Sequence, residues 1–113
     1  MSYDIDLVID TGAGRMATAA EIGNYTWNCR PMFEAAAADK YPEIQSPHDL
    51  IGKTGAEALP ILAHIVSRME ADPATYEAMN PDNGWGSYKT WLPFLRKWRD
   101  ACAEHPATIV NVC

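Results

Sequence analysis

Histidine and cysteine readily act as bases, nucleophiles and metal ligands, and this chain has three of each. They are His48, His64, His105, Cys29, Cys102 and Cys113. The histidines fall in unrelated segments, and neither His nor Cys recurs three or four residues from His64, whereas a zinc site needs clustered ligands. The cysteines form no Cys-x-x-Cys pair. We therefore expect no metal site, no cofactor and no assembled catalytic set, and we interpret the chain as a protein that is not an enzyme.

Asp10-Thr11-Gly12 is the pattern closest to a catalytic motif, because it follows the apolar residues Leu7–Ile9. It resembles the Asp-Thr-Gly triplet of retroviral-type aspartic proteases, in which an Asp from each of two subunits shares a proton. Those proteases are almost entirely β, with a glycine-rich flap and a late Ile-Gly-Arg segment, and this chain has neither segment. A strand followed by Asp-x-Gly is also an ordinary turn. We therefore interpret residues 10–14 as a turn and keep a protease that uses Asp10 as the least favoured alternative.

Trp85 is set apart from the other aromatic residues because glycines flank it inside the polar loop Asn80–Ser87. Such a tryptophan either folds back to cover the core, which we expect, or stands exposed as an interface anchor. The candidate interaction residues around it are Asp72, Glu77, Asp82, Asn83, Trp85 and Tyr88. The three acids bracket the loop, and they form either a solvated acidic face or a surface that steers a basic partner.

Four segments have the composition or alternation of β-strands. Tyr3–Ile9 alternates, with Tyr3, Ile5, Leu7 and Ile9 on one face, which predicts a strand with one side in water. Residues 15–22 are compatible with either a second short strand or a helical turn. Asn24–Cys29 and Ala107–Val112 are rich in β-prone residues and are predicted as strands.

Helices are predicted between these strands. One begins at Pro31 and ends before Pro42, and a short one runs from Pro73 to about Met79. Thr54–Ala71 is the strongest helix, because Thr54-Gly55-Ala56-Glu57 fits a capping box; Pro60 predicts a bend or a start nearer residue 57. Ser87 is expected to cap Tyr88–Glu104, where Pro93 again bends or delays the helix.

The apolar face of Tyr88–Glu104 carries Trp91, Leu95, Trp98 and Cys102, which we expect in the core. Because helices are grouped between early strands and a late one, the fold class is α+β. We expect one domain spanning residues 1–113. Its sheet is small, antiparallel or mixed, with about three strands (N-terminal, central and C-terminal), and three to four helices cover it.

The charge of the chain limits its partners. It has 113 residues, a formal net charge of −6 and a sequence pI of about 4.8. Direct nucleic-acid binding needs a basic face, so we expect none, and we expect a basic protein or a nucleic-acid-handling complex as partner, with a homodimer left open. An odd number of unpaired cysteines, an acidic N-terminal segment and no apolar stretch of roughly 20 residues predict a cytoplasmic protein that is not held in a membrane.

Several short motifs occur together along the chain. They are Ser2-Tyr3-Asp4-Ile5-Asp6-Leu7, Asn24-Tyr25-Thr26-Trp27-Asn28 leading into Pro31-Met32-Phe33, Gly52-Lys53-Thr54-Gly55-Ala56-Glu57, and Asp82-Asn83-Gly84-Trp85-Gly86. In this order they resemble a group of small proteins, mostly uncharacterised, that tailed phages and prophages encode. The resemblance brings no active site with it.

The resemblance implies an accessory phage protein. Small acidic proteins of this kind often bind host machinery, and inhibitors of CRISPR complexes and of other defence systems are one such class. The expected function is therefore protein–protein binding that inhibits or modulates a host defence complex. A structural or assembly homo-oligomer of a phage is the alternative.

Overall fold

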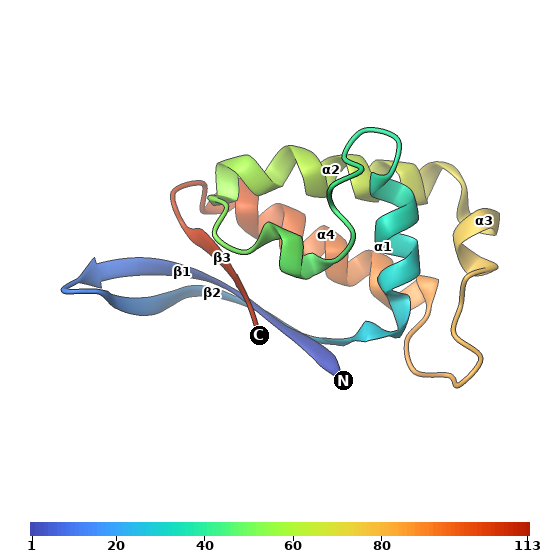
Figure 1. Cartoon of the computed structure of the whole chain (residues 1–113), viewed down its shortest axis with the longest axis horizontal. Coiled ribbons are helices and arrows are strands. Elements are labelled where there is room, and N and C mark those ends of the chain that lie inside the picture. The colour runs from blue at the N-terminus through green and yellow to red at the C-terminus, as the bar shows by residue number, and fades with distance from the viewer.

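The computed structural model describes residues 1–113 and contains one three-stranded antiparallel sheet. Its strands are β1 (Ser2–Gly12), β2 (Arg15–Thr26) and β3 (Ile109–Val112), in the order β2-β1-β3. The helices lie together on one side of the sheet (Figure 1). This arrangement confirms the predicted α+β fold with N-terminal, central and C-terminal segments in the sheet.

Four α-helices and two short 3₁₀-helices connect β2 to β3. They are η1 (Trp27–Cys29), α1 (Arg30–Ala37), η2 (Pro47–Leu50), α2 (Gly55–Ala71), α3 (Pro73–Glu77) and α4 (Tyr88–Glu104). The long helices α2 and α4 pack against each other in opposite directions, and Arg96 on α4 donates to Glu70 near the end of α2 at 2.6 Å. No helix combines the length and the apolar character needed to cross a membrane.

The two long helices begin in the same way. Thr54 and Ser87 accept hydrogen bonds from the backbone N–H three residues ahead, so each hydroxyl satisfies an amide that the first helical turn leaves free. Pro60 and Pro93 stand at the same position, six residues after the cap, and both face solvent. The predicted later start of α2 is therefore wrong, because its capping box forms at Thr54.

The structure decides one open prediction near residue 20 and corrects another. Residues 15–22 form part of β2 and not a helical turn, because they pair with the exposed half of β1. The predicted strand Asn24–Cys29 stops at Thr26, and Trp27–Cys29 is a 3₁₀-helix. Thr26 causes this change of structure, since its hydroxyl accepts a hydrogen bond from the Asn28 N–H and turns the chain toward α1.

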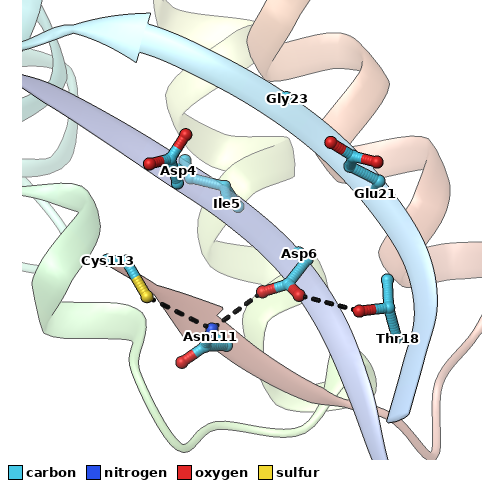
Figure 2. A pocket seen from close by; sticks show the side chains of 8 residues that line it. All are labelled: Asp4, Ile5, Asp6, Thr18, Glu21, Gly23, Asn111 and Cys113. Atoms are coloured by element: carbon cyan, nitrogen blue, oxygen red, sulfur yellow. Dashed lines mark hydrogen bonds between the residues drawn. The ribbon is translucent and has the colours of Figure 1, made fainter.

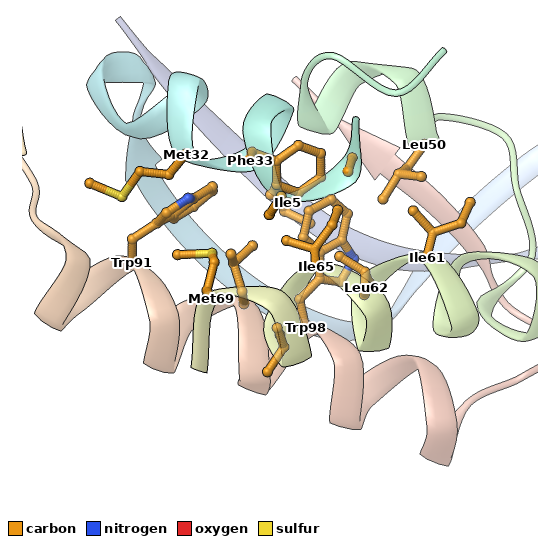
Figure 3. Close-up of a cluster of buried hydrophobic side chains, with 14 of the residues drawn as sticks. Ile5, Met32, Phe33, Leu50, Ile61, Leu62, Ile65, Met69, Trp91 and Trp98 are labelled. Carbon is orange, nitrogen blue, oxygen red and sulfur yellow. The ribbon is translucent and has the colours of Figure 1, made fainter. Parts of the chain in front are cut away.

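The core lies between the sheet and the helices and contains 26 buried residues (Figure 3). Phe33 on α1 contacts Trp91 and Trp98 on α4, with ring centres 6.2 and 6.3 Å away. Both tryptophans are fully buried, as is Cys102, which confirms their predicted place in the core. Neither indole N–H finds an acceptor, so each costs roughly 1–3 kcal/mol that the burial of the large ring must offset.

The β1–β2 hairpin extends past the helices as an arm (Figure 1). Tyr3, Ile5 and Leu7 are buried as predicted, but Ile9 is 43% exposed because no helix reaches this part of β1. Every residue from 9 to 19 is exposed. At the tip, Ala13 and Gly14 both have positive φ, which is the geometry of a tight two-residue hairpin turn.

Candidate interaction surface

Trp85 is the most exposed aromatic residue, with 70% of its surface open to solvent. It lies in the connection between α3 and α4, the loop that passes below α3 in Figure 1. The expectation that it folds back onto the core is therefore wrong, and the alternative of an exposed side chain holds. An exposed indole is a candidate contact residue, because Trp is enriched among the residues that dominate interface affinity.

Hydrogen bonds hold the backbone around Trp85 in place. The Asn83 side-chain oxygen accepts from the Trp85 N–H at 2.9 Å, which closes a local turn. The Asn28 amide donates to the Trp85 carbonyl at 3.3 Å and to the Asn83 side chain at 3.5 Å. The loop is thereby tied to η1, and Trp85 is presented on a braced backbone.

The C-terminal end of the loop is anchored by Tyr25 from β2. Its hydroxyl lies 2.6 Å from the Thr90 hydroxyl and accepts from the Ser87 N–H at 3.1 Å. Burial is the main cause that raises the pKa of Tyr25. Gly86 adopts φ +88°, and a Cβ there would lie 2.6 Å from the Thr26 methyl carbon. Only glycine therefore lets the loop approach β2 this closely.

Trp27 is a second exposed aromatic residue beside this loop, with 37% of its surface open. Its ring stacks on Tyr3 at 5.7 Å and meets His48 edge-on at 5.9 Å, so one side of the ring is supported by the protein. Trp27 and Trp85 adjoin Thr26 and Gly86, which are in contact. Trp27 is absent from the predicted interaction residues, because the sequence pattern placed it in a strand. Thr26 before it is a residue type that commonly caps helices, and this could have indicated that the strand ends there.

The six predicted interaction residues do not form one cluster. Asp82, Asn83 and Trp85 are exposed on the loop. Tyr88 is buried, and its hydroxyl donates to the Met69 carbonyl at 2.7 Å, so it supports the loop and offers no contact surface. Asp72 caps α3 by accepting from the Thr75 N–H and hydroxyl.

Glu77, the last of the six, lies apart from Trp85. It is exposed at the end of α3 and lines a small hollow of about 270 Å³ together with Asn80, Ser87, Tyr88 and Lys89. Lys89 places a positive charge in that hollow. Asp72 and Glu77 therefore belong to α3 and its border with α4, while Asp82 is the acid that accompanies Trp85.

The open face of the sheet carries a second polar surface that the sequence reasoning did not single out. Asp4, Asp6, Thr18, Glu21, Asn111 and Cys113 line a hollow of about 330 Å³ there (Figure 2). Asp6 accepts from the Thr18 hydroxyl and from the Asn111 amide. Alternation along β1 places Asp4 and Asp6 on one face, but only the strand pairing shows that no basic side chain of β2 or β3 lines the hollow.

His64 and Cys102 have two of the most reactive side chains, and each lies in its own structural setting. His64 lies 2.8 Å from Asp39, and this pair, with Arg68, ties the end of α1 to α2; the His64 bond is the largest cause that lowers the pKa of Asp39. Burial raises the pKa of Cys102 to about 11, which leaves it a thiol at neutral pH. No three or more His, Cys, Asp or Glu side chains come together as metal ligands.

Asp10 acts as a turn residue at the far end of the arm. Its carboxylate accepts from the Gly12 N–H at 2.8 Å, and the Thr11 hydroxyl donates to the Arg15 carbonyl. The predicted turn over residues 10–14 is therefore confirmed for Ala13 and Gly14, whereas Asp10, Thr11 and Gly12 belong to β1. The comparison with known proteins adds no family to these findings, because no family model, no curated protein and no solved structure matches the chain.

Proposed function

We propose that this chain is a binding protein that docks onto another protein through the surface around Trp85. The observation that carries the proposal is the 70% exposure of Trp85 on a loop whose backbone is held by Asn28, Asn83 and Tyr25. A backbone that is already held loses little conformational freedom on binding, and Trp is among the residues that contribute most to interface affinity.

The polar groups around the two exposed tryptophans suit the rim of an interface. Asn28, Asp82 and Asn83 are exposed beside them and can make hydrogen bonds once water is displaced. Asp82 and the net charge of −6 favour a partner with a basic surface, since complementary charge speeds association and excludes acidic competitors.

The biological setting that we propose follows from the resemblance to phage-encoded proteins. In this setting the chain is an accessory protein in the bacterial cytoplasm that binds a host defence complex or another nucleic-acid-handling complex and inhibits or modulates it. Its basic target surface is one that normally faces nucleic acid, which the acidic chain would occupy in place of that ligand. An assembly role as a homo-oligomer is the alternative.

Replacement of Trp85 tests the proposed surface. The immobilised wild-type chain should retain a bacterial protein from a lysate, and Trp85→Ala should lose it, with an affinity roughly 30-fold lower or worse once the partner is purified. Asn28→Ala should weaken binding less, because it loosens the loop without removing the ring. Binding of the wild-type chain should weaken as salt is raised, since the acidic rim is screened.

Ile51→Ala is the matched control, because Ile51 is also apolar and 50% exposed but lies between η2 and α2. It should bind like the wild-type chain. If Ile51→Ala and Trp85→Ala reduce retention equally while both keep the wild-type circular dichroism spectrum, the Trp85 surface is not the contact. Retention of no protein at all would count against a binding function.

A further inference from the structure

We draw no further inference here: the strongest candidate, the outer edge of β2 beside α4, carries no proposal because nothing in the structure shows what covers it.

Discussion

Single residues decide whether the Trp85 loop can be presented to a partner. Gly86 approaches Thr26 so closely that there is no room for a side chain on its α-carbon. The side-chain amide of Asn28 donates hydrogen bonds to two acceptors of the loop. Trp85 itself makes none of these side-chain contacts. Small and polar neighbours therefore hold the backbone of the loop that carries the exposed ring, and changes in those neighbours should alter the stability of the fold.

Gly86→Ala should destabilise the protein by roughly 2–4 kcal/mol, because it adds backbone strain at φ +88° to an overlap with Thr26. Gly84→Ala is the matched control: φ is +73°, but a Cβ there meets nothing within 4 Å, so the cost should be about 1–2 kcal/mol of backbone strain alone. Urea unfolding followed by tryptophan fluorescence measures both. Equal losses in the two variants would show that the contact with Thr26 is not close.

At the scale of elements, α2 and α4 are positioned by their caps and by each other. The N–H groups of Gly55 and Ala56 donate to the carbonyls of Thr108 and Pro106, so the start of α2 is fastened to the segment that leads into β3. Thr54 and Glu57 satisfy the remaining groups of that helix end. The first turn of α2 therefore links the helical layer to the sheet.

The Glu57 carboxylate should make stability depend on pH. Its pKa is lowered, chiefly because its carboxylate accepts from the Thr54 N–H. A carboxyl whose pKa is lower in the folded state stabilises that state above its unfolded pKa of about 4.3, and the contribution disappears as pH falls through the lower folded value. Glu57→Gln should therefore lose less stability than the wild-type chain between pH 5 and pH 3, measured by urea unfolding at each pH.

Glu43→Gln controls for the change in net charge, because Glu43 is exposed and its carboxylate has no hydrogen-bond partner. Asp39, whose pKa is also lowered, remains in both variants and keeps part of the acid sensitivity. If Glu57→Gln and the wild-type chain lose stability in parallel as the pH falls, the capping box does not form in solution.

At the scale of the whole molecule, the net charge of −6 should affect stability. The chain has fifteen acids and nine bases, and several acids, among them Asp4, Asp6 and Glu21, have no ion-pair partner. Excess charge of one sign repels itself in the compact state. The arm and the open sheet face place part of this charge away from the helices, which are linked by Arg96–Glu70 and Arg68–Asp39.

Added salt should stabilise the protein at neutral pH. An increase from about 20 mM to about 300 mM sodium chloride shortens the screening length severalfold, so the repulsion weakens and the Tm should rise by a few degrees. Differential scanning calorimetry on dilute protein measures the shift. The same experiment near the pI of about 4.8 is the control and should give a smaller shift. A Tm that falls with salt would show that attractive pairs outweigh the repulsion.

Much of the architecture follows from local patterns. The caps at Thr54 and Ser87, the buried tryptophans of α4 and the alternation of Tyr3, Ile5 and Leu7 each depend on residues within a few positions, and their predictions are confirmed. The points that local patterns left open or predicted wrongly have non-local causes. Residues 15–22 become a strand because β1 pairs with them, and Ile9 is exposed because no helix extends that far.

The amino-acid sequence by itself determined that the chain turns back at Ala13 and Gly14, because turn formation is a local property. It also determined the acidity of the chain. Only the tertiary structure decided that Trp85 is exposed beside Trp27, and that β2 keeps a free edge next to α4. Exposure and edge cover depend on which distant segments pack together, and no single segment carries that information.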